Sequence, residues 1–159
     1  MSEDRPDQSE DYRLLPGVRL DEFLATKLAS IAERFRRCTG EHLVITDGVR
    51  TPAEQAALIA ARLSLGRTLL IYRRQDLATE LYEEYRMAVA AKYDPQIALT
   101  GVIQAQLSRG DYISAHLSGR AVDIRSRSMT PKQRDVFLRI SRSVAHRAVS
   151  YTHLTLPTN

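Results

Sequence analysis

Hydrophobic side chains recur every three or four residues early in the chain, which is the spacing of one face of an α-helix. This stripe consists of Leu20, Phe23, Leu24, Leu28, Ile31 and Phe35. Gly40 follows it and is a typical residue at the end of a helix. The pattern therefore predicts an amphipathic helix that ends at Gly40 and packs one face against a core.

Two later segments carry the signature of a helix start. Thr51 can cap a helix, Pro52 suits its first position, and Glu54 completes a capping box. Residues 130–133 repeat this arrangement with glutamine in the last place. The helix that they open is expected to bury an apolar stripe of Phe137, Leu138, Ile140 and Val144.

Short runs with β-branched residues predict strands at 42–46 and 120–125. Asp47-Gly48 is a typical turn that ends the first strand. In the second run, Val122 and Ile124 alternate with Asp123. Since side chains alternate between the two faces of a strand, we expect Asp123 to lie opposite the core.

The segment 66–110 is predicted to be an inserted pair of helices broken at Asp94-Pro95. Its tyrosines are better explained by packing between helices than by ligand stacking. They are Tyr72, Tyr82, Tyr85 and Tyr93. The polar and acidic residues 1–17 predict a disordered tail, which leaves one domain over 18–147.

The expected fold class is α+β, with helices packed on one face of a small, mainly antiparallel sheet. The sheet is expected to contain 42–46, 120–125 and a C-terminal strand. The whole chain has 159 residues, of which 43% are hydrophobic and 26% are charged. This composition fits a soluble globular protein. Because Cys38 is the single cysteine, a metal site would need histidine and carboxylate ligands.

The formal net charge of +4 comes mostly from arginines that are spread along the chain. A nucleic-acid surface more often shows a concentrated basic stripe. We therefore expect no nucleic-acid partner, although a small basic nucleic-acid-binding protein stays a third hypothesis. No stretch approaches the ~20 apolar residues of a membrane span, and no secretory signal is visible.

The stretch "SAHLSGRAVDIR" places a histidine and an aspartate close to small residues. A catalytic zinc accepts imidazole and carboxylate ligands and keeps one position open for water. His116 and Asp123 could supply two such ligands, and small residues such as Gly119 let the backbone approach a ligand closely. A third protein ligand would have to come from elsewhere in the chain.

Residues 114–123 resemble the S-x-H-x-x-G-x-A-x-D signature of the D-alanyl-D-alanine metallopeptidases. These are VanY-like and VanX-like carboxypeptidases and dipeptidases with a hedgehog-like fold. Upstream, "ITDGVRTPAEQAAL" is similar to the strand, turn and helix that carry the arginine of that family. Both motifs occur in the order of the family, and the resemblance spans roughly 18–147.

The resemblance implies a zinc cofactor held by His116 and Asp123. It implies that Arg50 binds a substrate carbonyl or carboxylate and stabilises the oxyanion. Gln55 and Ser114 match positions that line the substrate-binding cleft. His153 falls near the place of the third ligand of the family.

The chain departs from the family near its C-terminus, where the family places a glutamate as general base. No glutamate follows Glu84. The final stretch, "VSYTHLTLPTN", resembles a translated sequencing adapter, so residues 148–159 are doubtful as native sequence. We expect the native C-terminus to be missing.

The resemblance implies a metallopeptidase that hydrolyses a peptide bond in peptidoglycan stem peptides, by D-Ala-D-Ala carboxypeptidase chemistry in a bacterium or phage. The alternative is a catalytically degenerate cell-wall or peptide-binding module of the same fold. Localisation is left open between the cytoplasm by default and delivery to the cell wall, by phage lysis or another route. The sequence does not predict an oligomeric state.

Overall fold

The computed structural model describes residues 11–147, apart from the side chains of 145–147, and has an α+β fold. The chain folds as two compact units. Residues 11–49 and 119–147 belong to the first, called here the sheet unit. Residues 50–118 form the second, called the helical unit. The helical unit is therefore inserted into the sequence of the sheet unit.

The sheet has three strands in the order β1-β2-β3, which are β1 (Tyr12–Leu14), β2 (Leu43–Asp47) and β3 (Asp123–Ile124). β1 runs parallel to β2, whereas β3 runs antiparallel to it. The sheet is thus mixed, and the prediction of a mainly antiparallel sheet was wrong. β3 is shorter than the predicted strand at 120–125, and the predicted C-terminal strand lies outside the described residues.

Strand β1 lies inside the segment that was predicted to be a disordered tail. Tyr12 is only 7% exposed and belongs to the core. The tail prediction was therefore wrong for β1, while residues 1–10 lie outside the described part of the chain. The physical reason is that a three-residue strand gains its hydrogen bonds and burial from its partner β2, so its own sequence carries little signal.

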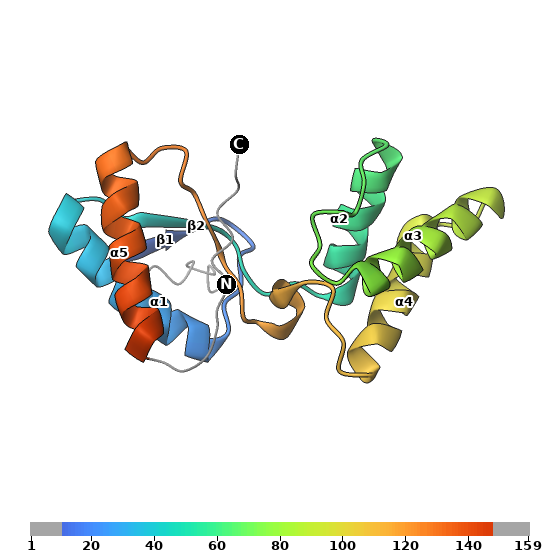
Figure 1. Ribbon diagram of the computed structural model, residues 1–159, viewed down its shortest axis with the longest axis horizontal. Coiled ribbons are helices and arrows are strands. Elements are labelled where there is room, and N and C mark those ends of the chain that lie inside the picture. Colours follow the sequence, from blue (N-terminus) through green and yellow to red (C-terminus); the bar gives the residue numbers. More distant parts are fainter. Residues whose placement is uncertain (1–10, 148–159) are drawn as a thin grey trace, which may run out of the picture. The chain divides into compact units, whose positions relative to one another are not determined.

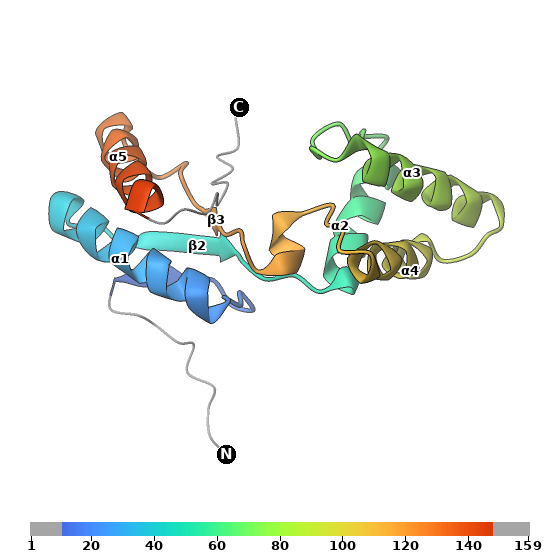
Figure 2. The ribbon, with the colours of Figure 1, turned by 60° about the horizontal axis from the view of Figure 1, so that its bottom comes forward.

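Two helices of the sheet unit, α1 (Glu22–Thr39) and α5 (Pro131–Arg147), pack side by side and cover the strands (Figures 1 and 2). Phe35 of α1 and Phe137 of α5 meet edge to face, with ring centroids 6.3 Å apart. The core that they share with the sheet includes Leu28, Ile31, Leu43, Ile45, Val122 and Ile124. This arrangement confirms the predicted packing of helices against a small sheet.

Helix α1 begins and ends with the expected capping chemistry. The carboxylate of Asp21 accepts from the backbone N–H groups of Phe23 and Leu24, and Gly40 ends the helix in the left-handed region with φ 77°. Phe23 is an exception to the predicted apolar stripe because it is 62% exposed. The ammonium of Lys27 lies 4.1 Å from the centre of its ring, so this phenyl group stays at the surface in a cation–π contact.

The helical unit contains α2 (Pro52–Ser64), α3 (Gln75–Ala90), α4 (Pro95–Ser108) and the short 3₁₀ helix η1 (Ala115–Ser118). α4 packs against both α2 and α3 (Figure 1). Their common core is apolar and contains Ala56, Ile59, Leu63, Leu77, Leu81, Leu99 and Ile103. No helix in the described part of the chain is long and apolar enough to cross a membrane.

The inserted pair of helices is present as α3 and α4, but the compact unit is larger than the predicted segment 66–110. It also includes α2, because Ile59 and Leu63 of that helix are buried with α4 residues such as Leu99. Asp94 and Pro95 separate the two helices and also start the second one. Asp94 caps α4 through two backbone N–H groups, and Pro95 occupies the first turn.

Both predicted capping boxes are confirmed. Thr51 accepts from the N–H of Glu54, whose carboxylate accepts from the N–H of Thr51. Thr130 and Gln133 make the same reciprocal pair at the start of α5. The local sequence therefore determines where these two helices begin.

Gly48 is buried at a close approach of two backbone segments in the sheet unit. The N–H of Val49 donates to the carbonyl of Arg19 at 2.7 Å. A Cβ atom on Gly48 would lie 2.0 Å from that same oxygen, so only glycine fits without moving the backbone. The glycine of the Asp47-Gly48 pair is therefore required by this tertiary contact.

We predict that Gly48→Ala lowers the free energy of unfolding by about 1–3 kcal/mol, because the new methyl group must displace the Arg19 backbone. Urea unfolding followed by circular dichroism measures this loss. Gly101→Ala is the matched control, since a Cβ on Gly101 in α4 meets nothing within 4 Å. It should raise stability by about 0.5–1 kcal/mol. Equal stability of Gly48→Ala and the wild type would contradict the close approach.

Candidate functional site

The candidate residues from the sequence belong to both units of the chain. Arg50, Gln55, Ser114 and His116 lie in the helical unit, and Asp123 lies in the sheet unit. His153 lies outside the described residues. Four of the candidates therefore lie within one compact unit, and Asp123 lies in the other.

A backbone hydrogen bond joins the two sequence motifs inside the helical unit. The N–H of Arg50 donates to the carbonyl of His116 at 3.1 Å. These residues are far apart in the sequence, yet the bond fixes the start of the first motif beside the histidine of the second. The structure thus brings together the two segments that the resemblance had connected only by their order.

The guanidinium of Arg50 is held by a buried amide. Its Nη1 donates to Oε1 of Gln55 at 3.0 Å, and Nε2 of Gln55 donates to the hydroxyl of Tyr72 at 2.9 Å. Gln55 is 0% exposed, whereas Arg50 and Tyr72 are partly buried. Because a buried amide without partners is costly, this continuous chain of hydrogen bonds fixes the positions of its members.

Tyr72 was missed as a site residue by the sequence analysis, which assigned the tyrosines to packing between helices. Tyr72 and Tyr85 do pack against the helical core, but Tyr82 and Tyr93 are 48% and 52% exposed. Burial raises the pKa of the Tyr72 hydroxyl, and the nearby charge of Arg50 offsets part of that effect. In the sequence, the only feature that sets Tyr72 apart is its position just before a helix, and this position is not specific for site residues.

His116 is held in the turn of η1 and is 6% exposed. Its backbone N–H lies 3.4 Å from Oγ of Ser114, and the N–H of Leu117 donates to the Ser114 carbonyl. Ser114 therefore shapes the turn that carries the histidine, which is a positioning role and adds to the predicted role in lining the cleft.

Gly119 follows this turn with φ +68°, a conformation that L side chains rarely adopt. A Cβ atom on Gly119 would lie 3.0 Å from Cβ of Asp21 and 3.6 Å from a methyl of Val49. The glycine of the histidine motif is thus explained by its backbone conformation and by a close contact within the sheet unit.

Asp123 lies on β3 between two core residues. Val122 and Ile124 are buried in the core, and Asp123 is partly buried, as the alternation predicted. Its Cα partner across the strands is Asp47 of β2, next to an irregularity in the register. The register shifts between Ile45 and Asp47, so the regular alternation of faces is interrupted at this pair.

Asp47 was recognised in the sequence only as a turn residue. Its carboxylate accepts from the N–H of Gly48 at 2.8 Å, which is a turn contact. The pairing with Asp123 depends on the register between β2 and β3, so no local signal could have revealed it.

The donor chemistry of His116 and Asp123 suits zinc, which binds imidazole nitrogen and carboxylate oxygen. Among residues 11–147, no group of three or more His, Cys, Asp or Glu side chains is placed to hold a metal ion. The described residues therefore offer ligands of the right type but not a complete zinc site. The predicted third ligand, His153, lies outside this range.

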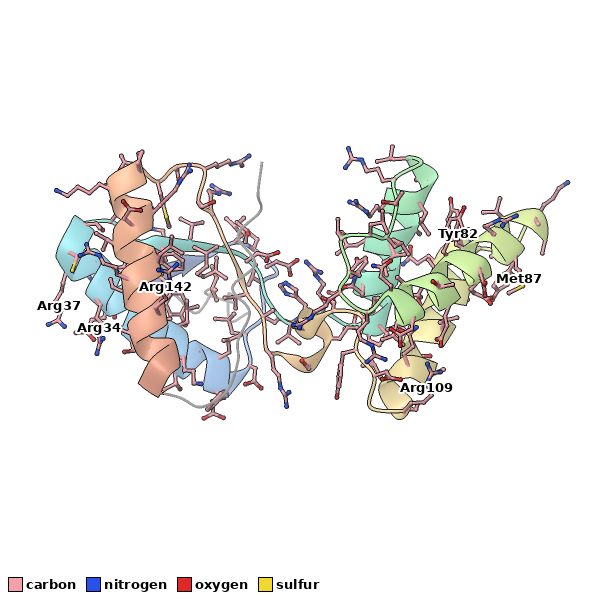
Figure 3. All side chains as sticks on the ribbon, viewed as in Figure 1. Arg34, Arg37, Tyr82, Met87, Arg109 and Arg142 are labelled. Carbon is pink, nitrogen blue, oxygen red and sulfur yellow. The ribbon has the colours of Figure 1, made fainter. Side chains whose placement is uncertain are left out.

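Two exposed acidic residues of α3, Asp76 and Glu80, take part in ion pairs. Arg74 donates to Asp76 and lowers the pKa of that carboxyl to about 2. Arg109, labelled in Figure 3, donates to both carboxylate oxygens of Glu80. The first pair lies within the start of α3, and the second links the end of α4 to α3, so both are structural contacts at an exposed surface.

Comparisons with protein-family models, with curated proteins and with solved structures gave no significant match for this chain.

Proposed function

We propose that the protein is a zinc-dependent metallopeptidase that hydrolyses a peptide bond in peptidoglycan stem peptides, of the D-Ala-D-Ala carboxypeptidase type. The observation that carries the proposal is the hydrogen bond from the Arg50 N–H to the His116 carbonyl. It pairs the arginine motif with the histidine motif, and each resembles a motif of that family. The hedgehog-like fold of the family is part of the same proposal.

Arg50 is the substrate-binding residue of this proposal. Its guanidinium is partly buried and is oriented by the Gln55 amide, so less side-chain freedom is lost when it binds an oxygen anion. A guanidinium pairs well with a carboxylate and also stabilises the negative charge that develops on a carbonyl oxygen under attack. Both roles fit a peptidase that acts near a free C-terminus.

His116 and Asp123 are the proposed zinc ligands, and the third ligand is proposed to be His153. Zinc, when bound, polarises the scissile carbonyl and lowers the pKa of a water molecule. The protein itself contributes the turn at Ser114, which sets the histidine, and the alternation on β3, which keeps Asp123 away from the core.

The second candidate function is a peptide-binding module that does not turn over its ligand. It is favoured by the lack of any glutamate after Glu84, where the family has its general base. This candidate keeps the Arg50 and Gln55 pair as the binding element. It differs from the peptidase in one measurable respect, which is the release of product.

We predict that the full-length gene product, with its native C-terminus and added zinc, releases D-alanine from a peptide ending in D-Ala-D-Ala. His116→Ala and Asp123→Ala should each lower bound zinc at least tenfold, because a two-ligand site binds metal much more weakly than a three-ligand site. Metal analysis after dialysis and a coupled D-alanine assay measure both quantities. Asp135→Ala, an exposed residue of α5, is the control and should change neither.

Zinc binding that is insensitive to both substitutions would contradict the metal site. Binding of the peptide without release of D-alanine would contradict the peptidase and favour the binding module.

We also predict that Arg50→Gln weakens the binding of a peptide with a free C-terminal carboxylate by about 10- to 100-fold, since a hydrogen bond to a charged group contributes about 1.5–3 kcal/mol. Isothermal titration calorimetry measures the dissociation constant. Arg86→Gln removes an exposed arginine of α3 and should leave it unchanged. Equal affinities of Arg50→Gln and the wild type would exclude Arg50 as the binding residue.

A further inference from the structure

The hydroxyl of Tyr72 has an unused donor in the described structure. A tyrosine hydroxyl can accept hydrogen bonds and can donate one. Here it accepts from Nε2 of Gln55 at 2.9 Å, and no described group accepts its own proton. Gln55 presents its amide nitrogen, which is a donor, to this hydroxyl, whereas its Oε1 accepts from Arg50. The Tyr72 proton is therefore available to a ligand oxygen.

The position of Tyr72 is fixed by its backbone as well as by Gln55. Its N–H donates to the carbonyl of Leu69 at 3.0 Å, and its own carbonyl accepts from the side-chain amide of Gln75 at the start of α3. The residue sits on the loop between α2 and α3, yet both its backbone and its hydroxyl have defined partners. This is the degree of fixation that a binding residue requires.

Arg50 and Tyr72 are bonded to the two ends of one amide. Arg50 donates to the oxygen of the Gln55 amide, and Tyr72 accepts from its nitrogen. Gln55 is fully buried, so neither partner can be exchanged for water at this amide. Two donors, one cationic and one neutral, are thus held next to a common anchor.

We propose that Tyr72 is a second substrate-binding residue, whose hydroxyl donates to the same terminal carboxylate that Arg50 binds. The inference rests on the proposed function in one respect, namely that the substrate is a peptide with a free C-terminal carboxylate. A carboxylate has two oxygens and several acceptor positions, so it can accept from a guanidinium and a hydroxyl together. A peptide with a neutral C-terminal amide would gain much less binding free energy from Arg50 and Tyr72 than one with a carboxylate.

The protonation of Tyr72 is compatible with this role. Burial raises the pKa of its hydroxyl above the ordinary value, so the group stays protonated at neutral pH and remains a donor. A tyrosinate would repel a carboxylate, and burial disfavours this charged form further.

The test compares two peptides on the full chain loaded with zinc. One is a diacetylated L-Lys-D-Ala-D-Ala tripeptide, and the other is the same peptide with a C-terminal amide. We expect Tyr72→Phe to weaken binding of the carboxylate form about tenfold, which corresponds to about 1.4 kcal/mol. Binding of the amide form should change less than threefold. Calorimetry measures both dissociation constants.

Tyr82→Phe is the matched control, because it removes one hydroxyl from an exposed tyrosine of α3 in the same unit (Figure 3). It should leave both dissociation constants unchanged. A second variant, Gln55→Leu, removes the common anchor and should weaken the carboxylate form at least as much as Tyr72→Phe. Thermal unfolding of each variant separates a loss of binding from a loss of folding.

Equal affinity of Tyr72→Phe and the wild type for the carboxylate form would overturn the inference, and so would an equal loss for both peptides. Tyr72-dependent binding without release of D-alanine would contradict the proposed hydrolysis and support the role of Tyr72. Release of D-alanine with an unchanged KM in Tyr72→Phe would support the proposed hydrolysis and contradict the role of Tyr72. If the wild type bound neither peptide at millimolar concentration, both the proposed hydrolysis and the role of Tyr72 would be overturned.

Discussion

The hydrogen bond from the Arg50 N–H to the His116 carbonyl closes the helical unit at its two ends. Residue 50 begins this unit, and His116 lies in its last turn. Without the bond, the two motifs would be separated by three helices and their loops. With it, the arginine and the buried histidine occupy neighbouring backbone positions, so the insertion of α2, α3 and α4 does not separate the residues on which the proposed chemistry depends.

The buried amide of Gln55 then sets the direction of the polar groups around this point. It joins the Arg50 guanidinium to the Tyr72 hydroxyl and is itself excluded from solvent. Buried polar groups must find partners, and a fully bonded chain of them permits few alternative arrangements. This is the structural reason for the fixed orientation of the Arg50 guanidinium, on which its proposed role in substrate binding depends.

The sheet unit contributes Asp123 by a different route. β3 has two residues, and its position depends on pairing with β2 and on burial of Ile124 against α1 and α5. The same pairing places Asp47 opposite Asp123. The glycines of the two motifs are explained in this unit by close contacts, since Gly48 lies against the Arg19 carbonyl and Gly119 against Asp21. The close packing of the fold is thus sufficient to explain the glycines in these motifs.

The sequence by itself determined the features that are local: the ends of α1, the capping boxes at Thr51 and Thr130, and the alternation around Asp123. Each depends on contacts within a few residues, so spacing and residue type are sufficient. Only the tertiary structure decided the parallel pairing of β1, the inclusion of α2 in the helical unit, and the link from Arg50 through Gln55 to Tyr72. These depend on contacts between distant segments, whose hydrogen bonds and burial exist only once the chain has folded and leave no periodic trace in the sequence.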